Sequence, residues 1–467
     1  MSTTPESPGN RRKFVSPSDI LDRRITSPPP PNSPVRPGMH SQLPLVPPAM
    51  SHSTPIPFRH NNIVGRYLGA FFGAILNPLF RAIYRILQVV YGVIGVHLPN
   101  SNATCPVLAY DIDASHPDSR PIYFRGGPAI LLLRDALLVI FHSWIAPLIP
   151  FPPAKFNTDI TWSGAIWQVV LLIGSLTMTF SVLFVPGIMI FTVPASYLII
   201  VLIRWVQGGS IIHSKPTPNP DGRPHPRFDA ESWMFVNGMC TSKSGLQLII
   251  NYLHAHFGRP VTGIYNCTYG FWFDLVECII QRDFSIPTDD IRLGYSELYK
   301  RVSNGAIRRV VLMGHSQGGI IISTWVDQLL TDFADDLDKL KRVEIYTFAS
   351  AANHFSGGPF GRIEHFVNTL DFVSRIGKFL RANADWLIDL GAIHFALAPK
   401  YDGIPPRPHG PIPVVKGRFA GRIFKRVGAS GHLLLSHYLA PGSSILDNPV
   451  VRANSKLKDY EHGRGAA

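Results

Sequence analysis

The chain contains 44 consecutive residues, from Ile160 to Ile203, without a single Asp, Glu, Lys or Arg. One helix needs about 20 apolar residues to cross a bilayer, so this run is long enough for two spans. A Pro186-Gly187 turn signal separates two apolar halves, which are Ile166–Val185 and Gly187–Trp205. Lys and Arg flank the run on both sides and are absent from the turn, so the positive-inside rule puts both flanks in the cytosol.

We therefore predict a transmembrane hairpin over residues 160–206. Such a hairpin either crosses the bilayer fully or dips into it and returns on the same side. The alternative is one long span kinked at Pro186, which would put the regions before and after it on opposite sides of the membrane.

Composition and charge agree with a membrane partner. The chain is 46% hydrophobic and only 16% charged, and its formal net charge is +13. No RNA- or DNA-binding motif accompanies that charge and the basic residues are dispersed, so we predict attraction to membrane lipids and not to nucleic acid. The four cysteines show no CxxC spacing, which argues against a zinc site, and we predict neither a metal nor a cofactor.

The first 151 residues are predicted to form two regions. Residues 1–60 are rich in proline and poor in aromatic residues, which indicates a disordered tail. Residues 61–151 are predicted to form amphipathic, membrane-associated helices, because the polar residues of Ile63–Val96 fall on one narrow stripe of a helix. A buried amphipathic helix packed on the protein is the alternative.

Short apolar runs alternate with helical patterns from residue 230 to residue 445. The apolar runs are Trp233–Val236, Val261–Tyr265, Arg309–Met313, Val343–Phe348, Ile363–Asn368 and Arg422–Val427. Helical patterns between them include Gly245–Phe257 and Gly319–Phe333. This alternation predicts an α/β domain with a mostly parallel sheet. A proline-rich linker at 216–229 precedes the domain, and residues 446–467 are predicted to be a basic, flexible tail.

The sequence Gly314-His315-Ser316-Gln317-Gly318 fits the pattern G-x-S-x-G. The pentapeptide alone is a weak signal, but an apolar run precedes it and a helical pattern follows it. A nucleophile elbow needs this strand–turn–helix transition, in which the serine stands at the carboxyl end of a strand. We therefore predict Ser316 as a nucleophile.

A serine hydroxyl needs a base to accept its proton, and the base needs an acid to orient it. In this fold type the chain order is serine, then acid, then histidine. Asp371 follows an apolar run at the end of a predicted strand, where the acid is expected. For the base, His432 comes just after the last predicted strand and His437 lies five residues later, so both remain candidates.

Acyl chemistry also needs donors for the developing oxyanion. The backbone N–H of Gln317, directly after the serine, is one predicted donor. The second is predicted in the loop after Trp233–Val236, from Gly238 or Met239.

Residues 230–445 resemble the α/β-hydrolase superfamily, and most of all its lipase-like branch of fungal membrane hydrolases. The segments that carry the resemblance are FVNG at 235–238, IYNCTYG followed by DLVE within 264–277, GHSQGG at 314–319, NTLD at 368–371 and GHLLLSHYL at 431–439. The resemblance implies an ester or thioester hydrolase with Ser316 as nucleophile, Asp371 as acid and His432 or His437 as base. The chain departs from the lipase pattern at Asn237-Gly238, where many lipases carry His-Gly.

Residues 372–415 separate the predicted acid from the predicted base and are too long for a simple connection. They form either a lid or acyl-chain pocket beside the site, or a surface helix packed on the core. Together these features predict a membrane-anchored serine hydrolase that cleaves lipid-like esters. Its expected location is the endoplasmic reticulum or a lipid droplet, with the catalytic domain facing the cytosol. The alternatives are an inactive hydrolase-like membrane scaffold and an acyltransferase that uses the same residues.

Overall fold

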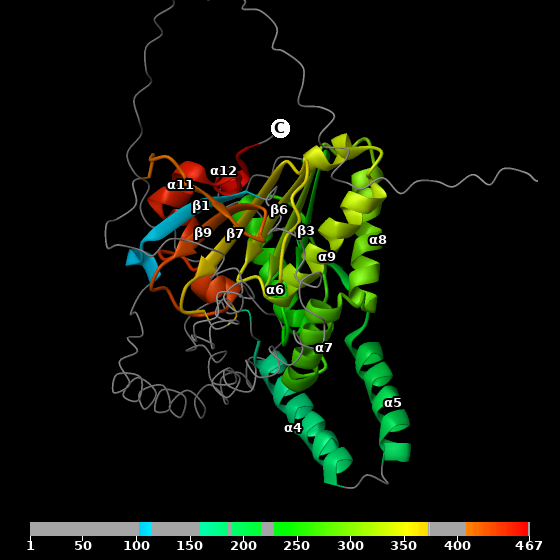
Figure 1. The fold of residues 1–467 in the computed structure, drawn as a ribbon. Coiled ribbons are helices and arrows are strands. Elements are labelled where there is room, and N and C mark those ends of the chain that lie inside the picture. The colour runs from blue at the N-terminus through cyan, green and yellow to red at the C-terminus, as the bar shows by residue number, and fades with distance from the viewer. Residues whose placement is uncertain are drawn as a thin grey trace, which may run out of the picture. The chain divides into compact units, whose positions relative to one another are not determined.

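The computed structural model describes residues 102–113, 159, 161–184, 189–215, 228–371, 373 and 408–465. Nine strands of these segments form one mixed sheet, in the order β2-β4-β3-β5-β6-β7-β9-β1-β8 (Figure 1). The strands are β1 (Val107–Asp113), β2 (Ile211–His213), β3 (Glu231–Val236), β4 (Val261–Ile264), β5 (Arg309–His315), β6 (Val343–Phe348), β7 (Arg362–Asn368), β8 (Val414–Lys416) and β9 (Gly421–Arg426). The six central strands, from β4 to β9, are parallel.

Helices cover both faces of the sheet. Side chains alternate along a strand, so Met234 and Val236 of β3 face one apolar core while Trp233 and Phe235 face the other. The first core includes residues of α7 (Phe271–Phe284), α8 (Asp289–Ser303) and α9 (Gln317–Asp332). The second core includes residues of α6 (Lys243–Phe257), α11 (Pro449–Asn454) and α12 (Lys456–Asp459). The predicted α/β architecture with a mostly parallel sheet is confirmed.

All six apolar runs predicted as strands are strands of this sheet, but the domain is larger than residues 230–445. Strand β1 lies in the region expected to be helical and pairs antiparallel with β9, from Val107–Arg426 to Ile112–Gly421. The tail expected to be flexible after residue 445 contributes α11 and α12, and buries Val451 and Tyr460. Both expectations are wrong. Strand β1 and the C-terminal helices are held by contacts with segments far away in the sequence, and a local pattern gives no sign of such contacts.

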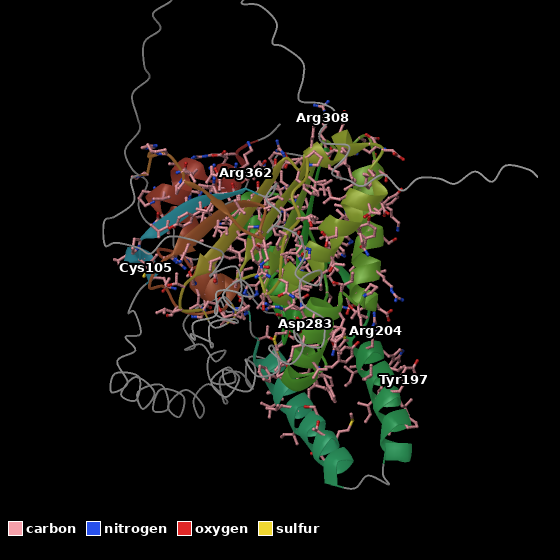
Figure 2. The ribbon with its side chains drawn as sticks, viewed as in Figure 1. Cys105, Tyr197, Arg204, Asp283, Arg308 and Arg362 are labelled. Atoms are coloured by element: carbon pink, nitrogen blue, oxygen red, sulfur yellow. The ribbon has the colours of Figure 1, made fainter. Side chains whose placement is uncertain are left out.

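Two apolar helices occupy the run that we expected to form a transmembrane hairpin. They are α4 (Trp162–Phe184) and α5 (Met189–Gln207), and we call them the apolar helix pair. They project beyond the sheet in Figure 1, and Figure 2 shows Tyr197 on the projecting part of α5 and Arg204 at its domain end. No helix among the described residues combines the length and the apolar character that crossing a membrane requires.

The predicted pair of full spans is therefore not found. Part of α4 packs on the α/β domain, where Gly164, Leu171 and Ser175 are buried at helical spacing. A stretch of α5 is apolar and exposed: every residue from Tyr197 to Leu202 is exposed, by fractions between 38% at Ile200 and 71% at Tyr197.

Several predictions fall outside the described residues. They are the disordered tail at 1–60, most of the helical region at 61–151, residues 216–227 of the linker, and residues 374–407 of the insertion between Asp371 and the histidines.

Candidate active site

Ser316 lies in the sharp turn between the end of β5 and the start of α9. Its φ of 57° is positive, which a residue with a side chain adopts only when the surrounding structure holds it there. The neighbouring glycines leave the required space: a Cβ at Gly318 would lie 2.3 Å from the carbonyl oxygen of Val236. A Cβ at Gly319 would lie 2.2 Å from the hydroxyl of Ser350. The strand–turn–helix arrangement expected around Ser316 is present.

His432 joins Ser316 to Asp371 by hydrogen bonds. Its Nε2 lies 2.9 Å from Ser316 Oγ, and its Nδ1 lies 2.9 Å from each carboxylate oxygen of Asp371. Asp371 follows β7 and His432 follows β9, while Ser316 follows β5. These strands are parallel, so their carboxyl ends meet at one edge of the sheet and bring the three side chains together.

His437 has a different place. Its Nδ1 accepts a hydrogen bond from the backbone N–H of Leu433, at 3.0 Å, and burial lowers its pKa to about 4. A neutral ring that supports the backbone next to His432 is the role this geometry allows. Of the two histidines considered, His432 is the one bonded to Ser316 and Asp371.

Other residues, which the sequence did not indicate, hold the acid and the histidine. The hydroxyl of Tyr438 donates to Asp371 at 2.8 Å, and the backbone N–H of Val373 donates to the same carboxylate at 3.0 Å. Nε2 of His315 lies 2.6 Å from the carbonyl oxygen of His432, and burial keeps the pKa of His315 well below its usual value. The neutral ring of His315 therefore donates to the backbone of His432 from beside the serine.

The turn after β3 packs against Ser316. A Cβ at Gly238 would lie 2.6 Å from Cβ of Ser316, so the backbone of this glycine approaches the serine closely. Met239 follows in the same turn, at residues 237–240. Both backbone N–H groups remain candidates for the second oxyanion donor, beside that of Gln317.

Asn237 fixes this turn to the end of β4. Its Oδ1 accepts the backbone N–H of Asn266 at 2.8 Å, and its Nδ2 donates to the carbonyl oxygen of Asn266 at 3.0 Å. Asn266 in turn donates from Nδ2 to the side chain of Gln317 at 2.7 Å. Asn237 thus connects the turn, through Asn266, to the residue after the serine.

Two carboxyl groups of α7 lie next to this site: that of Asp274 contacts Cys240 in the turn, and that of Glu277 contacts the side chain of Gln317. Asp274 accepts hydrogen bonds from the backbone N–H of Cys240 and from Thr268 Oγ1, and burial raises its pKa to about 6. Burial, together with the charges of Asp274 and Asp290, raises the pKa of Glu277 to about 8.

We expect these carboxyl groups to make the protein less stable as the pH rises. The folded-state pKa of Glu277 exceeds its ordinary value of 4.5, so the folded chain binds the proton more tightly than the unfolded chain. The stabilisation from neutral Glu277 is complete below pH 4.5 and is lost as the pH rises through about 8. Urea unfolding across this range should show a falling free energy of unfolding, and Glu277→Gln should make it less steep. An equal slope in both proteins would contradict the assignment.

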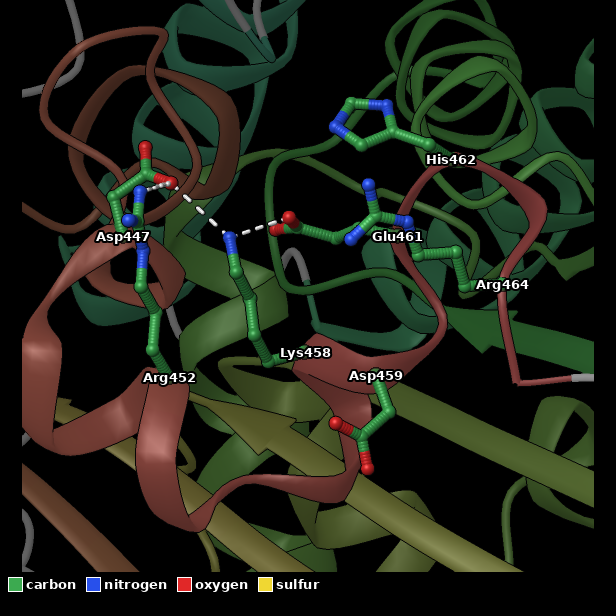
Figure 3. A pocket seen from close by; sticks show the side chains of 7 residues that line it. All are labelled: Asp447, Arg452, Lys458, Asp459, Glu461, His462 and Arg464. Carbon is green, nitrogen blue, oxygen red and sulfur yellow. Dashed lines mark hydrogen bonds and ion pairs between the residues drawn. The ribbon is translucent and has the colours of Figure 1, made fainter. Parts of the chain in front are cut away.

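A separate charged cavity of about 500 Å³ lies at the opposite, amino-terminal edge of the sheet (Figure 3). It is lined by Asp447, Arg452, Lys458, Asp459, Glu461, His462 and Arg464. Arg464 of this lining is followed by Gly465, whose carbonyl oxygen accepts a hydrogen bond at 3.0 Å from Arg309, the first residue of β5. Lys458 bridges Asp447 and Glu461, so charges within the cavity neutralise one another.

Within the described segments, no group of three or more His, Cys, Asp or Glu side chains is placed to hold a metal ion. The chain matches no known protein-family model, and no protein of curated function matches it significantly in sequence. The chemistry of the site is therefore inferred from the contacts among Ser316, His432 and Asp371.

Proposed function

We propose that the protein is a serine hydrolase of the α/β-hydrolase type, which cleaves lipid-like carboxylic esters. The observation that carries this proposal is the hydrogen-bonded chain from Ser316 through His432 to Asp371, at the carboxyl edge of a parallel sheet. A strained serine, a base within 2.9 Å of it and a buried acid on the other side of the base are the parts that acyl transfer needs.

In the proposed reaction, His432 Nε2 accepts the proton of Ser316 while Oγ attacks the carbonyl carbon of the ester. The resulting oxyanion accepts hydrogen bonds from the N–H of Gln317 and from Gly238 or Met239. His432 then gives the proton to the departing alkoxide, which leaves as an alcohol, and the acyl group stays on Ser316. Water, deprotonated by His432, releases the acid and restores the serine. Asp371 keeps Nδ1 of His432 protonated and stabilises the imidazolium.

We propose a lipid surface as the partner of the apolar helix pair. Six consecutive exposed residues, Tyr197–Leu202, cover more than a full helical turn, and five of them are aliphatic. Helices that are apolar around their circumference are typical of an apolar environment. The excess of basic residues favours anionic headgroups beside them. The endoplasmic reticulum and the lipid droplet, with the site facing the cytosol, remain the proposed locations.

Pre-steady-state kinetics on a soluble chromogenic ester, p-nitrophenyl butyrate, test the proposed reaction. We expect an initial burst of nitrophenol close to one equivalent per chain, because the acyl-enzyme accumulates when deacylation is slower than acylation. Addition of a short alcohol distinguishes hydrolysis from acyl transfer, since a transferase converts the acyl group mainly to a new ester. Absence of both burst and turnover would favour the scaffold alternative.

Gly238→Ala should lower kcat about 100-fold, because the new Cβ would lie 2.6 Å from Cβ of Ser316 and must displace it. Gly305→Ala is the matched control, since a Cβ at Gly305 meets nothing within 4 Å. Both kcat and the melting temperature should be measured for the two variants. Equal kcat values would show that the turn after β3 does not constrain the serine.

A further inference from the structure

The apolar helix pair is bonded to the turn that packs against Ser316. On the inner face of α4, Nε2 of Gln168 donates to the carbonyl oxygen of Cys240 at 3.1 Å and to Thr268 Oγ1 at 2.8 Å. Cys240 ends the turn at 237–240 and has a positive φ of 58°. A residue with a side chain holds such a conformation only with support from its neighbours, and Gln168 supplies part of that support.

Both helices of the pair meet at Thr268. At the end of α5, Nε2 of Gln207 donates to the carbonyl oxygen of Thr268 at 2.7 Å. Thr268 Oγ1 donates to Asp274 at 2.6 Å, and the same carboxylate oxygen accepts the backbone N–H of Cys240 at 2.8 Å. A change in how α4 and α5 pack on the domain therefore reaches Cys240 by two routes.

The chain just before α4 is bonded to the loop that carries the histidine. Asp159 precedes the first residue of α4 by three positions and is 4% exposed. Its carboxylate accepts the backbone N–H of Leu434 and, at 2.8 Å, that of Leu435. These amides follow His432 by two and three residues, so the carboxylate fixes the backbone that positions the imidazole.

We propose that the apolar helix pair regulates the Ser316 site, with Asp159 and Gln168 as positioning residues that couple lipid binding to catalysis. This inference rests on the proposed function. In water the pair exposes a large apolar surface, and a lipid surface removes that penalty. A ligand shifts a conformational equilibrium by its difference in affinity for the two states. Lipid covers the exposed apolar parts of α4 and α5, and it therefore favours the arrangement in which these parts project from the domain. In that arrangement Gln168 holds the turn at Cys240 and Asp159 holds the loop after His432.

The test compares hydrolysis of p-nitrophenyl butyrate by the full chain with and without vesicles of phosphatidylcholine and an anionic phospholipid. Because the substrate dissolves in water, it reaches the site without vesicles, and kcat at saturating substrate reports on the protein. We expect vesicles to raise kcat of the wild type about tenfold with little change in KM. Gln168→Met keeps the length of the side chain but removes both N–H donors, and it should lose most of this rise. Asp159→Asn should lose most of it too, because an NH2 group then faces a backbone N–H.

Gln247→Met is the matched control. Gln247 on α6 also donates from Nε2 to one carbonyl oxygen, that of His213, and to one side-chain oxygen, that of Asn251, both at 3.0 Å. It contacts neither loop through these bonds, so its variant should respond to vesicles as the wild type does. Flotation of all four proteins with vesicles should be equal, which separates binding from coupling.

A wild type that vesicles do not stimulate, or a Gln168→Met protein that keeps the full rise, would overturn the proposal. If the wild type shows no Ser316-dependent turnover under either condition, the proposed function fails instead. Hydrogen exchange on the wild type keeps the proposal testable should the variants not fold. We expect vesicles to slow exchange at the Leu434, Leu435 and Cys240 amides, and unchanged rates at these three would also overturn it.

Discussion

Replacing Ser316 by alanine is expected to lower kcat for ester hydrolysis roughly 10⁶-fold. The variant lacks the Oγ that lies 2.9 Å from His432 Nε2, so no acyl-enzyme forms. Substrate binding and the N–H donors near Gln317 remain, and a small residual rate above that of water should persist. Initial rates with p-nitrophenyl butyrate, measured at high enzyme concentration, give the ratio.

Ser323→Ala is the matched control for this variant. Ser323 is a buried serine on α9, the helix that follows Ser316, and its hydroxyl donates to the carbonyl oxygen of His354 at 2.6 Å. Its replacement removes a hydrogen bond of similar burial and should lower stability by about 1 kcal/mol while leaving kcat within a few-fold. A Ser316→Ala protein that retains substantial turnover would show that another group performs the chemistry.

Replacing His432 by alanine should have an effect nearly as large, about 10⁴-fold or more in kcat. The variant loses both the acceptor for the Ser316 proton and the donor to the departing alkoxide. Melting temperature and circular dichroism should be close to those of the wild type, because the His432 ring makes its bonds within the site.

His437→Asn tests the competing assignment at the same time. An asparagine oxygen can replace Nδ1 of His437 as the acceptor for the Leu433 N–H, which lies at 3.0 Å. We therefore expect kcat of this variant to stay within about tenfold of the wild type, with the difference arising from small shifts of His432. A larger loss in His437→Asn than in His432→Ala would reverse the roles of the two histidines.

Local patterns in the sequence were enough to predict the central sheet, Ser316, Asp371 and two candidate histidines. Each parallel strand is a short apolar run of its own, because both faces of the strand are buried. The sequence also orders Ser316 before Asp371 and His432, and the parallel topology then brings the ends of β5, β7 and β9 to one edge. Sequence alone could not separate His432 from His437, since five residues of spacing say nothing about which ring turns toward the serine.

The features that escaped prediction depend on contacts between distant segments. Strand β1 pairs with β9, about 310 residues later, and the short run VLAYDID carries no sign of its partner. Asp159 contacts Leu434 and Leu435 across about 275 residues of sequence. In the sequence this aspartate is only the last charge before an uncharged run, so its place beside the histidine loop follows from the fold alone.

The central claim is that Ser316 is the nucleophile, and reaction with a fluorophosphonate probe tests it most directly. The probe phosphonylates a serine only when a nearby base activates its hydroxyl. We predict one phosphonyl group per full-length chain, found by peptide mass spectrometry on Ser316, and no labelling of Ser316→Ala. Equal labelling of both proteins, labelling at another serine, or no labelling of the wild type would contradict the claim.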